Sequence, residues 1–126
     1  MTRFLIDANS AIYALSGAFP QMRAKFEDSE LGAIAISTIS YAEIALGSQI
    51  GRPPNTDTLE AFVATVPILP FDEAAARAYA KLPFKRARFD RLLAAHALSL
   101  GATVITNNEA DFSDIPGLSV VNWTLA

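Results

Sequence analysis

Three acidic residues that lie far apart in the sequence share one local setting. Asp7 comes directly after a short apolar run, Glu43 follows a second run, and Asp90 opens an apolar pattern with helical spacing. In a parallel α/β sheet, the carboxyl ends of the strands and the adjacent helix starts meet at one edge, where ligands bind. Carboxylates gathered there repel one another unless a cation lies between them, and hard oxygen ligands suit Mg²⁺ or Mn²⁺. The sequence therefore predicts a divalent-metal site formed by these acids.

Two further groups of polar residues are expected near this site. A polar cluster at residues 107–111, which includes Asn108 and Asp111, follows the apolar run at 102–106. Four of the ten basic residues fall in one short stretch around Asp90, and they are Lys85, Arg86, Arg88 and Arg91. A basic run is most often a solvated surface, but beside a metal site it also suits phosphate groups, and both interpretations stay open. The net charge of −3 does not by itself indicate a nucleic-acid partner.

Each acid also has a purely structural explanation. Asp7 or Asn9 can cap the helix that follows the first strand. Ser40 and Glu43 have the spacing of a capping box, and Asp90 is favoured at a helix start by the helix dipole. These explanations do not account for the presence of all the acids at the same edge of the expected sheet.

The sequence excludes several kinds of active site. It has one histidine, so a two-histidine nuclease mechanism is impossible within one chain, and it has no cysteine for a disulfide or a thiolate metal site. No nucleophile elbow, phosphate-binding P-loop or dinucleotide-binding fingerprint is present. His96 falls about 240° away from Asp90 around a helix, at ~100° per residue, and we expect it to be structural.

Composition favours a cytoplasmic protein without a membrane segment. Apolar residues make up 52% of the chain, but no apolar run approaches the roughly 20 residues needed to span a bilayer. The N-terminus lacks the charged, apolar and small-residue segments of a signal peptide. The absence of cysteine is compatible with a reducing compartment. We expect the surplus of apolar residues to form a core and a buried partner surface.

Short apolar strands alternate with helical segments, which indicates an α/β fold with a mainly parallel sheet. The five expected strands cover residues 3–7, 33–37, 66–69, 104–106 and 118–121. Helices are expected through Ile12 to Gly17, over about 20–29, from Ser40 to Gly47, after a cap at Thr56 or Asp57, from a cap at Asp72 to about Leu82, and over roughly 88–100. Pro67 marks the third strand as an edge strand, because proline cannot donate to a central ladder. We expect one domain over residues 1–126.

Four segments carry motifs whose order and spacing are distinctive. They are Phe-Leu-Ile-Asp-Ala-Asn at 4–9, the segment 36–47 that contains Glu43, Phe-Asp-Arg-Leu-Leu-Ala-Ala-His-Ala-Leu at 89–98, and Thr-Asn-Asn at 106–108. Together with Leu-Pro-Phe-Asp at 69–72, these motifs resemble the PIN domain, and in particular the VapC-type toxins of bacterial toxin–antitoxin pairs. The similarity runs nearly end to end. It implies a three-layer α/β/α sandwich around a mainly parallel five-stranded sheet.

The resemblance implies a magnesium- or manganese-dependent endoribonuclease, a toxin that cleaves RNA with a metal-activated water and so inhibits translation and growth. Asp7 and Asp90 are then the main metal ligands, and Glu43 is a ligand or a base that orients the water. The family often has aspartate at the position of Asn108, where a neutral amide can hold a metal-bound water but adds no charge. Asp111 could substitute for that acid from one helical turn away.

The resemblance also implies positioning residues and partners. Asn9 and Thr106 are expected to position groups at the site. The residues expected to hold RNA phosphates, without reading sequence, are Lys85, Arg86, Arg88 and Arg91. Besides the RNA substrate, the expected partners are a small VapB-type antitoxin and a second copy of the chain in a homodimer. Tyr13, Phe19 and Phe26 are candidates for the apolar surface that meets a partner.

Two other functions fit parts of the sequence. A noncatalytic PIN-like binding module is allowed by Asn108, and metal-dependent RNA cleavage would separate it from an enzyme. A receiver-type phosphoacceptor domain is another small α/β fold with acids at strand ends. That class requires paired acids after the first strand and a lysine after the fifth, whereas Asp7 is alone and no suitable lysine follows residues 104–106.

Overall fold

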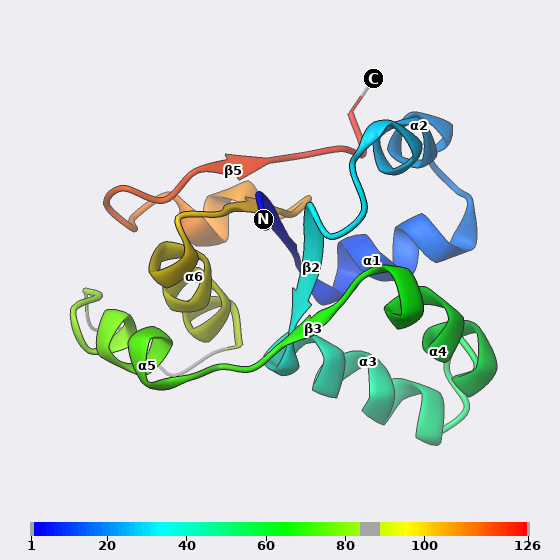
Figure 1. Ribbon diagram of the computed structural model, residues 1–126, viewed down its shortest axis with the longest axis horizontal. Helices are drawn as coiled ribbons and strands as arrows, with labels where there is room; N and C mark the ends of the chain where they lie inside the picture. The colour runs from blue at the N-terminus through cyan, green and yellow to red at the C-terminus, as the bar shows by residue number, and fades with distance from the viewer. Residues whose placement is uncertain (1, 84–88, 126) are drawn as a thin grey trace.

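Strands and helices alternate along the chain in the computed structural model, which describes residues 2–83 and 89–125 (Figure 1). The strands are β1 (Phe4–Ile6), β2 (Ile34–Ser37), β3 (Ile68–Leu69), β4 (Thr103–Ile105) and β5 (Val120–Val121). The helices are α1 (Ala8–Ser16), α2 (Pro20–Asp28), α3 (Thr38–Gln49), α4 (Thr56–Thr65), α5 (Glu73–Ala80) and α6 (Phe89–Leu100), and a short 3₁₀ helix, η1 (Glu109–Phe112), precedes β5. Each strand and helix expected from the sequence is present.

The five strands form one sheet in the order β3-β2-β1-β4-β5, and every pairing between them is parallel. At the centre, Ile6 of β1 is in register with Ile36 of β2 on one side and with Ile105 of β4 on the other. The chain runs outward from β1 to β3 and then from β4 to β5 in the opposite direction, so the strand order reverses beside β1. Such a reversal opens a crevice at the carboxyl ends of the strands. The parallel sheet is confirmed, and β3 is an edge strand as Pro67 predicts.

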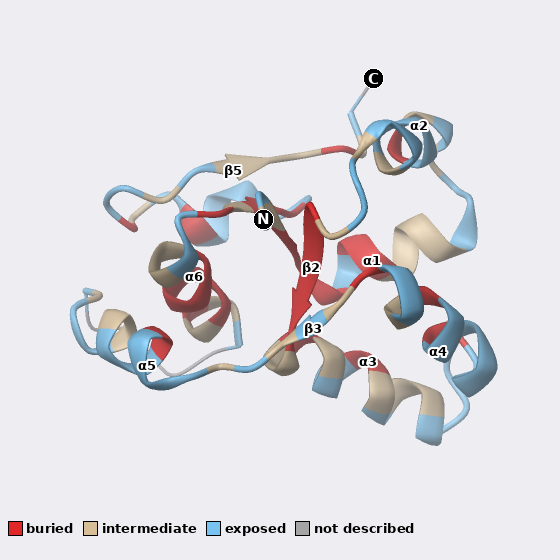
Figure 2. Ribbon diagram, in the orientation of Figure 1, coloured by how far each residue is buried: buried red, intermediate tan, exposed pale blue. Residues whose placement is uncertain are grey.

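Helices cover both faces of this sheet and confirm the three-layer α/β/α sandwich (Figure 1). Alternate side chains of β1 point to opposite faces. Ile6 belongs to a core formed with α1, α2, α3 and α4, and Leu5 belongs to a second core formed with α6 and η1. Helix α5 lies outside α6 on the second face (Figure 1). Figure 2 shows β2 buried along its whole length, as expected for a strand inside a parallel sheet.

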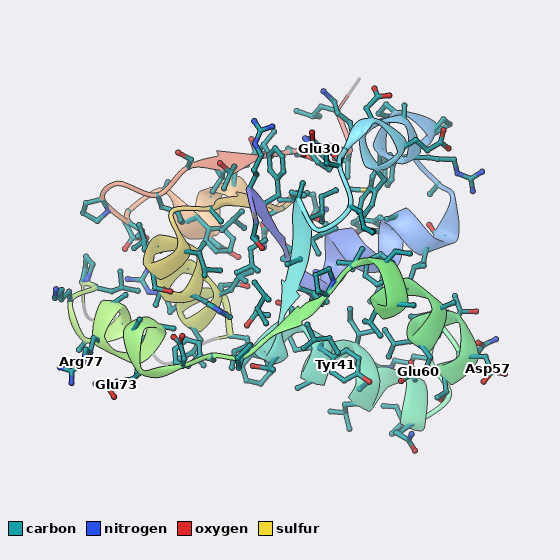
Figure 3. The ribbon with its side chains drawn as sticks, in the orientation of Figure 1. Glu30, Tyr41, Asp57, Glu60, Glu73 and Arg77 are labelled. Carbon is teal, nitrogen blue, oxygen red and sulfur yellow. The ribbon has the colours of Figure 1, made fainter. Side chains whose placement is uncertain are left out.

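Short polar side chains accept backbone N–H bonds at the starts of α1, α3, α4 and α5. Asp72 caps α5 as predicted, with its carboxylate accepting from the backbone N–H of Ala75 at 3.0 Å. Helix α4 is capped by Asn55, just before the predicted Thr56 or Asp57. On the exposed side of this layer, α3 and α4 are joined by the hydroxyl of Tyr41, which donates to Glu60 at 3.2 Å (Figure 3).

Helix α3 begins earlier than the sequence suggests. Ser37 is both the last residue of β2 and the cap of α3, and its hydroxyl accepts from the backbone N–H of Ile39 at 3.1 Å. Strand and helix are therefore joined without a loop, and Ser40 is buried inside the helix. The capping-box explanation of Glu43 is wrong, because Ser40 is not the cap.

The aromatic residues that are candidates for a partner surface pack partly against the core. Tyr13 meets Phe19 edge-on with ring centroids 5.4 Å apart, and Phe26 packs against the same core. Their side chains are partly buried. More exposed apolar side chains lie near the end of α3, where Leu46 is 64% exposed and Ile50, the C-terminal cap of the helix, is 61% exposed. Within residues 2–83 and 89–125, no helix has the length and apolar character needed to cross a membrane.

Candidate active site

Asp7 stands at the carboxyl end of the central strand and also caps the next helix. One of its carboxylate oxygens accepts from the backbone N–H of Ser10 at 2.7 Å, and its own N–H donates to the carbonyl of Ile105 in β4 at 3.0 Å. The residue is 7% exposed. Capping therefore falls to Asp7 and not to Asn9, which is exposed in the first turn of α1. Because a carboxylate has two oxygens and about four lone-pair sites, capping with one oxygen is compatible with metal binding.

Glu43 shows that the three acids lie within electrostatic reach of one another. Burial, together with the negative charges of Asp90 and Asp7, raises the pKa of Glu43 to about 7. The residue as a whole is exposed on α3, so its carboxyl group is partly desolvated while other atoms meet solvent. Three separate elements thus bring these acids to the edge where the strand order reverses: the start of α1, the second turn of α3 and the first turn of α6.

Asp90 is held in place by the residue that follows it. The guanidinium of Arg91 donates to both carboxylate oxygens of Asp114 at 3.0 Å and to the carbonyl of Pro83 at 2.7 Å. Arg91 is only 4% exposed. This paired guanidinium fixes the start of α6, where Asp90 sits.

The predicted RNA-binding group changes as a consequence. Arg91 is buried and bonded to Asp114, so its guanidinium is not exposed to RNA phosphates, and we leave it out of that group. Lys85, Arg86 and Arg88 lie outside the described residues.

The chemistry of the three acids fits a hard divalent cation. Across residues 2–83 and 89–125, no group of three or more carboxylate, histidine or thiolate side chains stands in a ready-made metal-binding arrangement. Mg²⁺ does not require one, because it keeps several waters and binds directly through one or two carboxylates. Glu43 carries repulsion from Asp90 and Asp7, and the buried hydroxyl of Ser10, next to Asp7, has no hydrogen-bond partner among the described residues. A hydrated cation beside Asp7 would relieve the repulsion and offer water to Ser10.

The polar cluster after β4 forms its own hydrogen-bond network. Thr106 is fully buried, and its hydroxyl accepts from the backbone N–H of Asn108 at 3.0 Å. The side-chain amide of Asn108 donates to the carboxylate of Asp111 at 2.5 Å. Asn108 and Asp111 are both exposed and bonded to each other, so Asp111 orients the amide of Asn108. The carboxylates whose charges act on Glu43 are those of Asp90 and Asp7.

His96 lies in the interior, in keeping with the structural role expected for it. It is 1% exposed, and its Nδ1 lies 2.8 Å from the hydroxyl of Ser37. Burial lowers the pKa of His96, and the charge of Asp72 opposes that shift. Sequence reasoning missed Ser37 and Ser10. Each had a signal: Ser37 stands where an apolar run ends, and Ser10 follows Asp7 at the spacing of a cap and its partner.

The sequence and fold are similar to those of known proteins. The sequence profile of the PIN domain matches residues 4–118. The chain is 29% identical over 133 residues to the tRNA(fMet)-specific endonuclease VapC of Shigella flexneri, and the match covers 98% of this chain and 100% of that one. The solved structure of DNA-bound VapBC from Salmonella typhimurium has a TM-score of 0.86 at 27% identity and covers 98% and 99% of the two chains. VapBC2 from Rickettsia felis, bound to a DNA fragment from their promoter, has a TM-score of 0.84 at 26% identity, with 97% and 99% covered. Because the profile spans nearly the whole chain, the protein belongs to the PIN-domain family.

Proposed function

We propose that the protein is a metal-dependent endoribonuclease of the VapC type, the toxin of a toxin–antitoxin pair. The observation that carries this proposal is the convergence of Asp7, Glu43 and Asp90 from three elements on one edge of the sheet. Membership of the PIN-domain family and similarity to proteins named as VapC endonucleases support RNA as the substrate. Mg²⁺ or Mn²⁺ is the cofactor that suits these oxygen ligands.

The residues divide the work of phosphodiester hydrolysis. When bound by Asp7 and Asp90, the divalent ion supplies Lewis acidity and makes water more acidic. Glu43 accepts hydrogen bonds from the attacking water and orients it. Asn108, held by Asp111, positions water through its amide but adds no charge, so a second metal ion binds less tightly than the first. Asn9 and Thr106 serve as positioning groups.

The proposal extends to partners. The solved structures of similar fold include VapBC complexes, which supports a small VapB-type antitoxin as the partner of this chain. RNA as substrate implies a cytoplasmic protein. Positive charge for the phosphates of the RNA comes from Lys85, Arg86 and Arg88. We also propose a homodimer, for which Leu46 and Ile50 offer exposed apolar surface at the end of α3.

Sequencing RNA 5′ ends after brief induction in cells tests this function. The wild-type protein should arrest growth and produce new 5′ ends at defined RNA positions, whereas Asp90→Asn should produce neither. Asp57→Asn is the matched control, because Asp57 also occupies the first turn of a helix but is exposed on α4. Growth arrest without new RNA ends, or full activity of Asp90→Asn, would contradict the proposal.

A noncatalytic PIN-like binding module is the second candidate. It is favoured by Asn108, which occupies a position where the family often has an acid, and by the absence of a ready-made metal-binding group within the described part of the chain. Such a module would bind RNA equally with magnesium and with chelator, and would leave it intact in both.

A further inference from the structure

We propose that the buried hydrogen bond between Ser37 and His96 positions the acidic site, by setting the helix that carries Asp90 against the start of the helix that carries Glu43. This inference rests on the proposed function and assigns a role in it to the only histidine of the chain. Neither Ser37 nor His96 touches metal or substrate in this scheme. Both are positioning residues.

The hydrogen bond joins two elements that reach the site from different parts of the chain. His96 lies in the middle of α6, about 9 Å along the helix axis from Asp90 at 1.5 Å per residue. Ser37 is fully buried at the junction of β2 and α3, where its hydroxyl accepts from the N–H of Ile39 at 3.1 Å. We assign the hydroxyl proton of Ser37 to Nδ1 of His96, 2.8 Å away, which leaves the ring proton on Nε2.

The linker between β3 and α5 also packs against His96. The ring of Phe71 meets His96 edge-on with centroids 5.7 Å apart, and the backbone N–H of Phe71 donates to the hydroxyl of Thr38 at 3.1 Å. The start of α3, the linker into α5 and the middle of α6 are therefore tied together at His96. Nδ1 of His96 and the hydroxyl of Ser37 thus have each other as partners inside the core.

Arg91 anchors the start of α6, and the contacts beside His96 explain why a directional bond in the middle of the helix adds to that anchor. Ala94, Ala95 and Ala97 are all fully buried. Methyl groups make weak, non-directional contacts, which restrict sliding or rotation of a helix less than a hydrogen bond does. A misplacement of about 1 Å in a catalytic group can cost on the order of a hundredfold in rate. Loss of the bond should therefore affect Asp90 through its helix.

Two substitutions of His96 separate positioning from stability. His96→Leu fills the space with an apolar side chain and removes the acceptor, whereas His96→Asn keeps a polar atom near the place of Nδ1 and leaves a cavity. We expect His96→Leu to melt at the higher temperature of the two in the absence of metal. We nevertheless expect its affinity for Mn²⁺ and its kcat each to fall about tenfold or more, as is typical when a group that orients ligands is lost. His96→Asn should recover most of both, and KM for RNA should stay near that of the wild type.

Calorimetric titration with Mn²⁺ alone measures metal affinity, thermal unfolding in chelator measures stability, and RNA cleavage measures kcat and KM. Ser99→Ala is the matched control, because the hydroxyl of Ser99 donates to the carbonyl of His96 at 2.7 Å without linking α6 to another element. It should keep wild-type Mn²⁺ affinity. If His96→Leu fails to fold, Ser37→Ala and Ser37→Thr give the same comparison, since threonine keeps the hydroxyl and should restore affinity.

Two results would overturn the inference. In the first, His96→Leu binds Mn²⁺ and cleaves RNA like the wild type. In the second, affinity and kcat follow melting temperature across the series, which would make the bond merely structural. A wild-type protein that neither binds Mn²⁺ nor cleaves RNA would instead overturn the proposed function, and this inference with it.

Discussion

At the scale of single residues, Asp7 combines two roles that a pair of substitutions can separate. Asp7→Asn keeps an oxygen that can accept from the N–H of Ser10 but loses the charge, and Asp7→Ala loses both. We expect both variants to lose RNA cleavage. The free energy of unfolding of Asp7→Asn should be close to that of the wild type. That of Asp7→Ala should be lower by about 1 kcal/mol, the usual contribution of a helix cap. Urea unfolding measures the difference, and equal stability of the two variants would remove the capping role.

Glu43 gives the site a pH dependence whose sign can be stated. Burial and the charges of Asp90 and Asp7 raise its pKa to about 7 in the metal-free folded protein, above the ordinary value of 4.5. The protonated form therefore contributes stability that is fully present below the unfolded pKa and is lost as the pH rises through about 7. The Glu43→Gln variant does not show this loss of stability, because a glutamine side chain is uncharged at every pH. In chelator, the melting temperature of Glu43→Gln relative to the wild type should rise from pH 5 to pH 8, and a constant difference would contradict this origin of the shift.

The acids and their supports differ in how far the sequence reveals them. Asp7, Glu43 and Asp90 could be predicted as a group, because the strand ends and helix starts that carry them must meet at one edge of a parallel sheet. Arg91 could not be placed, because its burial depends on Asp114, a partner far along the chain. The role of His96 depends in the same way on Ser37.

At the scale of elements, the ion pair of Arg91 should stabilise the start of α6. Arg91→Ala leaves the half-buried carboxylate of Asp114 and the carbonyl of Pro83 without this donor. We expect a loss of about 2–3 kcal/mol in the free energy of unfolding, below the range for fully buried pairs because Asp114 is partly exposed. Arg77→Ala is the control, since the exposed pair of Arg77 with Glu73 on α5 should contribute only about 0.3–0.5 kcal/mol. Equal losses in urea unfolding would show that the Arg91 pair is no stronger than a surface pair.

Element boundaries show where local sequence rules are limited. Helix α5 starts at its predicted cap, Asp72, because that signal is local. Helix α3 starts earlier than predicted, because β2 passes into it through Ser37 without a loop, and the Ser40–Glu43 spacing imitates a capping box inside a helix. Spacing alone cannot distinguish a capping box at a helix start from the same residue pattern inside a helix.

At the scale of the whole molecule, the exposed apolar side chains near the end of α3 predict that the protein forms a homodimer. Leu46 and Ile50 are both exposed and one helical turn apart. Leu46→Glu would place a charge in an interface formed there, so we expect the wild type to sediment as a dimer at micromolar concentration and the variant as a folded monomer. Leu31→Glu is the control, because Leu31 is also highly exposed but precedes β2. A monomeric wild type would contradict the homodimer.

The order of the strands is harder to predict from the sequence than the presence of a parallel sheet. Alternating apolar strands and helices predict parallel pairing. They do not tell which neighbours β1 will have, and that depends on how the two cores pack on its Leu5 and Ile6 sides. The observed position of β1 between β2 and β4 is what brings Asp7 to the centre of the site.

Metal-dependent RNA cleavage by the purified protein tests most directly whether these acids form the catalytic site. Protein first treated with chelator is given Mg²⁺ in increasing amounts, and cleavage of RNA is followed for the wild type, Asp90→Asn and Asp57→Asn. We predict that magnesium restores cleavage in the wild type and in Asp57→Asn, because Asp57 lies on the exposed surface of α4, and that Asp90→Asn stays inactive at every concentration. Cleavage that persists in chelator, or full recovery by Asp90→Asn, would contradict a metal site formed by Asp7, Glu43 and Asp90.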